Sequence, residues 1–173
     1  MTPRHTLAAS GLLAAYIATI PASNWLVAHV GPVPVGLGYT APAGVYTVGL
    51  ALVLRDLARE AVGRAVVVAA IAVGAALSWW LAAPALAVAS AAAFGVAESM
   101  DFAVYEPLRK RGLAVAVAAS NAVGLLADSL IFLWLAFGSL TFLSGQLLGK
   151  AWMTLAAVAV ITAIARRREP VTA

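Results

Sequence analysis

Two residues of opposite charge lie inside apolar stretches of the chain. Asp128 comes nine residues before Phe137, where one stretch ends, and Lys150 comes nine residues after Thr141, where the next begins. The short connection predicts antiparallel helices, with both charges about 13–14 Å from that end at about 1.5 Å per residue. This is near the middle of a bilayer core about 30 Å thick. We expect an ion pair that either only fixes helix register or lines a cavity contacting a substrate or a proton.

Amide side chains extend the polar character of both stretches. Asn121 lies seven residues before Asp128, with Gly124 between them, and Gln146 lies four residues before Lys150. These spacings place the members of each set on one helix face. The amides either join helices by hydrogen bonds or bind a polar ligand together with the charges.

Two further carboxylates fall near the opposite edge of the predicted membrane. Glu98 and Asp101 are three residues apart in an apolar stretch that starts near Pro84, so they share a helix face. Carboxylates this close repel each other at low dielectric, which favours the neutral form of one of them. Glu98 precedes the nearest basic cluster by several residues and is difficult to explain as a solvated charge. We expect a functional role for it.

A charged segment runs from Arg55 to Arg64. Asp56 and Glu60 are four residues apart on one predicted helix face, and Glu60 precedes Arg64 by four, the favourable order for a helical ion pair. Asp56, Glu60 and Arg64 are either an inner-side functional motif or the charged end of a membrane helix.

A polar and an aromatic residue follow a proline near the end of the first apolar stretch. Asn24 and Trp25 come soon after Pro21, which frees a backbone carbonyl and bends a helix. They either supply an amide and a ring to a binding site or anchor a kinked helix at the membrane interface.

The sequence shows no pattern that indicates catalysis or metal binding. It has no cysteine, which excludes disulfides, thiol catalysis and cysteine metal sites. Its two histidines, His5 and His29, are far apart and expected on opposite sides of the membrane. We find no phosphate-binding loop and no pairing of a nucleophile with a base. We therefore predict a protein that is not an enzyme and that holds no metal and no cofactor.

The elements that position these residues are membrane helices. Of the 173 residues, 64% are hydrophobic and 10% are charged, and the mean hydropathy is +0.98. Soluble domains are about 45–50% apolar and about 25% charged, so a soluble fold and disorder are both excluded. Six stretches are long enough to span a bilayer, which predicts one all-α integral membrane domain over residues 1–173. The predicted spans are residues 7–28, 41–60, 65–81, 84–103, 113–137 and 141–165.

Basic residues mark one side of the predicted membrane. They flank or connect alternate spans: Arg4, segment 55–64, cluster 109–111 and cluster 166–168. The other connections have no charged residue: 29–40, 82–83 and 138–140. Because positively charged loops stay in the cytoplasm, we expect six spans with both termini cytoplasmic. The net charge of +4 is then a topology signal and not a nucleic-acid footprint.

The first span and the connection after it carry two further expectations. Pro32 and Pro34, with three nearby glycines, predict a non-helical loop on the outer side. Residues 1–28 are either the first span or a cleaved signal peptide. The long apolar run favours the span, because cleavage would leave five spans.

Several short motifs occur in order over about residues 20–155. They are Asp56-x-x-x-Glu60-x-x-Gly63-Arg64, Glu98-x-x-Asp101-x-x-Val104-Tyr105-x-x-Leu108-Arg109-Lys110, Ser120-Asn121, Asp128-Ser129-x-x-Phe132, Ala136-Phe137-Gly138, Gly145-Gln146 and Lys150. The ordered set resembles the VUT family, the queuosine precursor transporters. The chain departs from that pattern at Val62, where tyrosine is expected, and at Ala119, where a polar or basic pattern is expected. These departures bear on the substrate more than on the fold.

The resemblance implies a fold and a function. The fold is a six-transmembrane-helix bundle resembling the S components, the substrate-binding subunits of energy-coupling-factor vitamin transporters. The function is import of a 7-deazaguanine base, such as 7-cyano-7-deazaguanine, across the bacterial plasma (inner) membrane. A buried carboxylate can accept two N–H groups of such a base, amides can pair with its other polar atoms, and aromatic rings can stack on it. The candidate substrate-binding residues are Asn24, Trp25, Glu98, Asp101, Asn121, Asp128, Gln146 and Lys150.

Two other functions fit the sequence. One is a vitamin or nucleobase binding subunit that needs a separate ATPase module, since this chain has no phosphate-binding loop. The other is a membrane scaffold in which the Asp128–Lys150 pair is only structural. The expected partners are a purine-like base and the lipid bilayer, without nucleic acid. The coupling ion, an energising module and the oligomeric state stay open.

Overall fold

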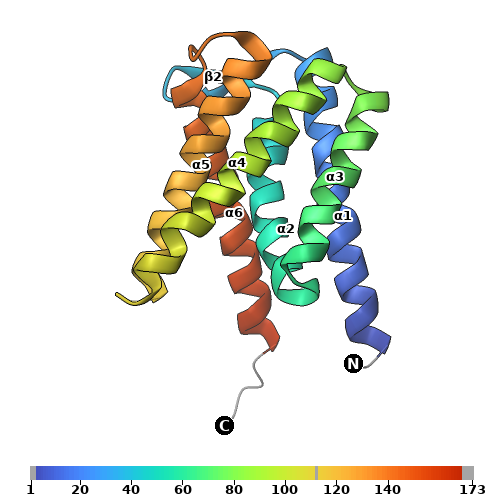
Figure 1. The fold of residues 1–173 in the computed structure, drawn as a ribbon, viewed down its shortest axis with the longest axis vertical. Coiled ribbons are helices and arrows are strands. Elements are labelled where there is room, and N and C mark those ends of the chain that lie inside the picture. Colours follow the sequence, from blue (N-terminus) through green and yellow to red (C-terminus); the bar gives the residue numbers. More distant parts are fainter. Residues whose placement is uncertain (1–2, 112, 169–173) are drawn as a thin grey trace.

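The chain forms a bundle of helices with one small hairpin (Figure 1). The computed structural model describes residues 3–111 and 113–168, and within them there are six helices. The elements in order are α1 (Pro3–His29), β1 (Pro32–Gly36), β2 (Tyr39–Pro42), α2 (Val45–Val62), α3 (Arg64–Leu81), α4 (Pro84–Arg109), α5 (Leu113–Phe137) and α6 (Leu143–Arg168). The predicted all-α membrane fold is confirmed.

Four of the helices are long and apolar enough to span a membrane by themselves. Within the described residues these spans are Ala8–His29, Arg64–Leu81, Pro84–Leu108 and Ala119–Phe137. The second half of α2 carries the charged residues of the segment 55–60, which lower its hydropathy. Because α2 and α6 pack against the other helices in the same bundle, we treat the chain as a multi-pass membrane protein.

The helices form a ring in the order α1, α2, α6, α5, α4, α3, in which each helix contacts the next. The pair α4 and α5 packs along much of its length, whereas α5 and α6 touch over a short stretch. Figure 1 shows the lower parts of α4 and α5 leaning away from α6, at the end of the bundle that holds both termini. The basic residues of the sequence gather at this end, so we call it the inner end. The end with the hairpin is the outer end.

The outer connection differs from the expected loop. Residues 32–42 form an antiparallel β-hairpin, and α2 begins at Val45 instead of near Ala41 because the preceding residues belong to β2. The turn uses Leu37 at φ 53° and Gly38 at φ 79°. Two successive positive φ angles match the twist of paired strands in a two-residue hairpin turn. The proline and glycine content alone indicated a loop and did not indicate this hairpin.

The hairpin rests on α6 because two glycines leave space for it. A Cβ atom at Gly145 would collide with the carbonyl of Thr40, and one at Gly149 would lie 2.7 Å from Val45 of α2 and 3.2 Å from Val35 of the hairpin. Val35 and Ala41 are buried there, in contact with Val45 of α2 and Leu148 of α6. The hairpin therefore covers the outer end of α6.

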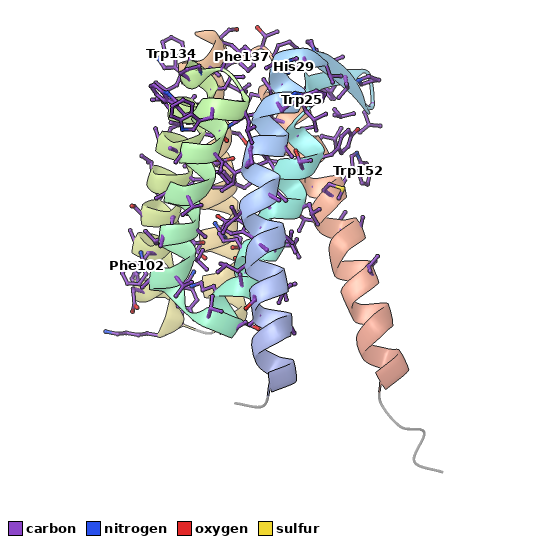
Figure 2. The ribbon with its side chains drawn as sticks, turned by 90° about the vertical axis from the view of Figure 1, so that its right-hand side faces the viewer. Trp25, His29, Phe102, Trp134, Phe137 and Trp152 are labelled. Atoms are coloured by element: carbon purple, nitrogen blue, oxygen red, sulfur yellow. The ribbon has the colours of Figure 1, made fainter. Side chains whose placement is uncertain are left out.

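Hydrophobic side chains also close the interior of the bundle near the outer end. We call this group the outer cluster. Its members come from α1, α4, α5, the connection after α5 and the start of α6, and they are Val27, Leu86, Ala89, Ala93, Ile131, Phe132, Leu133, Ala136, Phe142 and Leu143. The same end carries exposed aromatic residues, among them Trp25, Trp134 and Phe137 (Figure 2). Exposed aromatic rings of this kind are typical of a membrane–water interface.

Candidate functional site

A cavity of about 180 Å³ lies inside the bundle, between α2, α4, α5 and α6. Its apolar wall includes Leu52, Phe94 and Leu125. Its polar lining includes Arg55, Asp56, Asp101, Asn121, Asp128 and Thr154. Few polar groups in a mostly apolar wall are typical of small-molecule sites.

A wider space of about 550 Å³, which we call the vestibule, adjoins the cavity on its inner side. The two spaces share Arg55, Asp56, Asp101 and Asn121 as lining residues. The vestibule has further charged and aromatic side chains: Arg59, Glu60, Phe102, Tyr105 and Glu106. The cavity therefore communicates with the inner end of the bundle, whereas the outer cluster and the hairpin cover its outer end.

Asp101 places a carboxylate at the junction of the two spaces. Asp101 is 6% exposed. Its Oδ2 lies 3.9 Å from Nη1 of Arg59, and the two groups form a loose ion pair. Its Oδ1 is buried and, among the residues that the structure describes, has no hydrogen-bond partner. A Cβ atom at Gly124 would lie 3.5 Å from the Asp101 Cβ, so the glycine leaves room beside this carboxylate. Asp101 is thus able to accept hydrogen bonds from a ligand.

Glu98 lies behind the cavity wall and not on it. Its Oε2 is 3.1 Å from Nη1 of Arg55, as an ion pair that is not aligned as a hydrogen bond, and its Oε1 is 3.5 Å from Nη1 of Arg59. Arg55 also donates from Nε and Nη2 to Oδ1 of Asp56, at 3.0 and 2.9 Å. Glu98 therefore orients two arginines that line the vestibule, one of which also reaches the cavity.

The predicted pairing of Asp128 and Lys150 is present. Lys150 Nζ donates to Asp128 Oδ2 at 2.5 Å and to Ser129 Oγ at 2.7 Å. Lys150 is 1% exposed and Asp128 is 4% exposed. Asp128 lines the cavity, so the ion pair forms part of the wall that separates the cavity from the outer half of the bundle.

Two predicted amide residues lie on the outer side of that ion pair. Asn24 is buried and accepts a hydrogen bond at Oδ1 from Ser90 Oγ, at 2.6 Å. Gln146 is also buried and comes one helical turn before Lys150 on α6. Asn121, by contrast, lines the cavity and the vestibule. The structure thus divides the predicted amides between two levels of the bundle.

Trp25 and Arg64 lie away from the cavity. Trp25 is 47% exposed and stacks on His29 at 4.7 Å between ring centroids (Figure 2). The expected helical pairing of Glu60 with Arg64 is wrong, because Gly63 at φ 85° ends α2 and Arg64 starts α3. The Arg64 guanidinium lies 4.3 Å from the centroid of the Phe102 ring. Of the inner-side motif, Asp56 and Glu60 line the vestibule.

The sequence did not single out three residues that the structure places near the polar interior. Arg55 was counted only as a topology charge, although its position next to Asp56 was a signal. Ser129, named from the sequence only as part of a family motif, contacts Lys150 and directly follows Asp128. Tyr16 is fully buried, and its hydroxyl has no hydrogen-bond partner among the described residues. A tyrosine in the middle of an alanine-rich span could have indicated this.

The groups around the cavity are suited to binding a small polar molecule. Within residues 3–111 and 113–168, no three potential metal-binding side chains come together. The carboxylates, guanidinium groups and amide around the cavity can form hydrogen bonds with a flat polar molecule, and Phe94 can pack against its ring.

Comparison with known proteins places the chain in a transporter family. The model of the family described as "Putative vitamin uptake transporter" matches residues 78–166, which is 89 of the 173 residues. The match includes α4, α5 and nearly all of α6, the helices that carry Asp101, Asn121, Asp128 and Lys150. No curated protein and no solved structure matches the chain. Because the match covers more than half of the chain, this protein belongs to the vitamin uptake transporter (VUT) family.

Proposed function

We propose that the protein imports a queuosine precursor, a 7-deazaguanine-type base, across the bacterial plasma membrane. The observation that carries the proposal is the unpartnered Oδ1 of Asp101 at the mouth of a small cavity. A guanine-type edge offers a ring N–H and an exocyclic amine side by side. A carboxylate accepts both in a bidentate, charge-assisted arrangement.

The size and the lining of the cavity support a base as the ligand. A cavity of about 150 Å³ admits one benzene molecule, so a cavity of about 180 Å³ is too small for a nucleoside. A bicyclic base bound there would extend partly into the adjoining vestibule. Phe94 offers a ring for packing, and Asn121 offers both a donor and an acceptor for the remaining polar atoms.

The direction in which the cavity opens is compatible with import. The vestibule lies at the inner end, where the positive-inside rule places the cytoplasm. In the outward direction, the ion pair and the outer cluster close the bundle. An importer with this shape is in the state that releases its substrate into the cytoplasm.

The test is thermal stabilisation of the detergent-purified protein by 7-cyano-7-deazaguanine, its aminomethyl analogue, guanine and a set of vitamins. A ligand at 100 times its Kd stabilises the folded state by about 2.7 kcal/mol. We expect a shift with the deazaguanines, and we expect Asp101→Asn to weaken it by at least about tenfold in Kd, because hydrogen bonds to a charged group contribute about 1.5–3 kcal/mol.

The control is Glu106→Gln, which makes the same charge change five positions further along α4, at an exposed residue that lines the vestibule but not the cavity. It should leave the ligand shift nearly unchanged. A shift with the deazaguanines that Asp101→Asn does not alter would remove Asp101 from the site.

A vitamin is the second candidate, favoured by the description of the matching family. A shift with a vitamin and none with the deazaguanines would overturn the proposal. It would indicate a vitamin transporter, or a binding subunit that works with a separate ATPase.

A further inference from the structure

Three buried polar atoms in the outer half of the bundle have no partner among the described residues. One is the hydroxyl of Ser78 on α3, and the other two belong to amide side chains: Nδ2 of Asn24, a donor, and Oε1 of Gln146, an acceptor. Asn24 is 1% exposed and Gln146 is 3% exposed. Leaving such atoms unpaired inside a protein is costly, and most buried polar atoms have partners. An unsatisfied donor and an unsatisfied acceptor are therefore unexpected in a wall that has only a structural role.

The two residues belong to one level of the bundle. Asn24 lies three residues inward of Val27 on α1, and Gln146 lies three residues inward of Leu143 on α6. Val27 and Leu143 both pack in the outer cluster. Ser90, which donates to Asn24, follows Ala89 of the same cluster on α4. Asn24 and Gln146 thus lie one helical turn below the same hydrophobic layer.

The next level inward holds the ion pair. Lys150 follows Gln146 by four residues on α6, and Asp128 lies four residues inward of Phe132 on α5. From the outer end, the order is therefore the outer cluster, the level of Asn24 and Gln146, the ion pair, and then the cavity. Polar groups continue through the bundle beyond the point where the cavity ends.

We propose that the transported molecule has a second binding station at Asn24 and Gln146, on the outer side of the Asp128–Lys150 ion pair. There Asn24 donates to a carbonyl of the molecule, and Gln146 accepts from one of its N–H groups, so the station takes an amide-type edge. The ion pair is the barrier between this station and the cavity. This inference rests on the transport function proposed above.

The first test asks whether water reaches the station from outside, and it needs no substrate. Because the chain has no cysteine, Gln146→Cys and Asn24→Cys each introduce a single thiol. A membrane-impermeant thiol reagent is added to the outer face of right-side-out vesicles. Thr141→Cys, exposed near the hairpin, is the positive control. Ala87→Cys is the buried control. Ala87 lies at a depth similar to that of Asn24 and Gln146, but it borders the lipid-facing groove between α3 and α4 and not the proposed station.

We expect both station thiols to be labelled, more slowly than the thiol at position 141. Minor conformations are typically populated at about 0.1–10%, which predicts rates about 10- to 1,000-fold lower. The thiol at position 87 should stay unlabelled over the same time. If both station thiols are labelled no faster than the thiol at position 87, the proposal is overturned. If one of the two variants does not fold, the other decides.

The second test separates contact with the molecule from mere accessibility. Gln146→Met keeps the shape of the side chain and removes the unpaired acceptor. We expect this variant to be at least as stable as the parent protein and to retain the ligand shift that depends on Asp101. Its uptake rate should fall by at least about tenfold, because it loses one hydrogen bond to the transported molecule. Unchanged uptake in this variant would overturn the contact. Failure of every deazaguanine to bind the parent protein would overturn the proposed function, and the thiol labelling would still decide whether the station exists.

Discussion

Lys150 Nζ lies 2.5 Å from Asp128 Oδ2, and both side chains are almost completely buried in the middle of the bundle. The two residues come from helices that touch over a short stretch. Their ion pair is therefore a principal link between α5 and α6. Because Asp128 also faces the cavity, a change in this link acts directly on the cavity wall.

The first prediction concerns this ion pair. Lys150→Met alone should lower the stability of the protein by about 3–5 kcal/mol, because it leaves a buried charge without its partner. The exchange Asp128→Lys with Lys150→Asp should recover much of that loss, as should Asp128→Leu with Lys150→Met. Thermal unfolding in detergent measures these differences.

Uptake by the same variants separates a structural pair from a functional one. A transporter that uses these groups should keep its fold in the apolar double variant and lose substrate binding. Full uptake with the apolar pair would show that the ion pair only fixes the packing of α5 against α6.

The second prediction separates Glu98 from Asp101. Glu98 holds Arg55 and Arg59 from behind the cavity wall, whereas Asp101 faces the cavity. Glu98→Gln should weaken the binding of guanine and of an analogue without the exocyclic amine by the same factor. Asp101→Asn should remove the preference for the amine, which is at least about tenfold for a hydrogen bond to a charged group. Equal loss of preference in both variants would place Glu98 in the site as well.

The third prediction concerns the seat of the hairpin. Gly145→Ala should destabilise the protein by about 1–3 kcal/mol, as overpacking does, because the added methyl group meets the Thr40 carbonyl. Gly95→Ala is the matched control, since nothing lies within 4 Å of a Cβ there. It should be neutral or stabilising by up to about 1 kcal/mol. Equal unfolding temperatures for the two variants would contradict the contact between the hairpin and α6.

The fourth prediction concerns orientation in the membrane. Thr40 lies on the hairpin and Lys110 at the inner end of α4, and both are exposed. A thiol introduced by Thr40→Cys should react with an impermeant reagent added outside intact cells. A thiol introduced by Lys110→Cys should react only after the membrane is made permeable. The reverse pattern would invert the topology and turn the vestibule toward the outside.

Much of the architecture could be predicted from the order of the residues, because lipid imposes simple requirements. Six apolar stretches became six helices, and the ends of α3 and α4 fall close to the predicted limits, apart from the extension of α4 to Arg109. The depth of Asp128 and Lys150 followed from counting residues along a helix of constant rise. The hairpin was missed because strand pairing depends on backbone angles at Leu37 and Gly38 and on the space that α6 offers.

The candidate site could be predicted only in its composition. Residue types and spacing indicated which polar side chains share a helix face, as for Glu98 and Asp101. They did not indicate that Glu98 turns toward Arg55 while Asp101 borders the cavity, because that depends on how α4 rotates against α2. Gly63 shows the same limit, since a single positive φ angle separates Glu60 from Arg64.

The sequence alone determined that this chain is a membrane protein, roughly where its helices run and that Asp128 and Lys150 lie deep in the bundle, because hydropathy and helical rise are local properties. The tertiary structure decided which buried groups meet. It joined Asp128 to Lys150, placed Asp101 at the mouth of the cavity, and left Asn24 and Gln146 on the far side of the ion pair. These relations depend on how whole helices pack and rotate against one another. Residues that are far apart in the sequence determine that packing jointly.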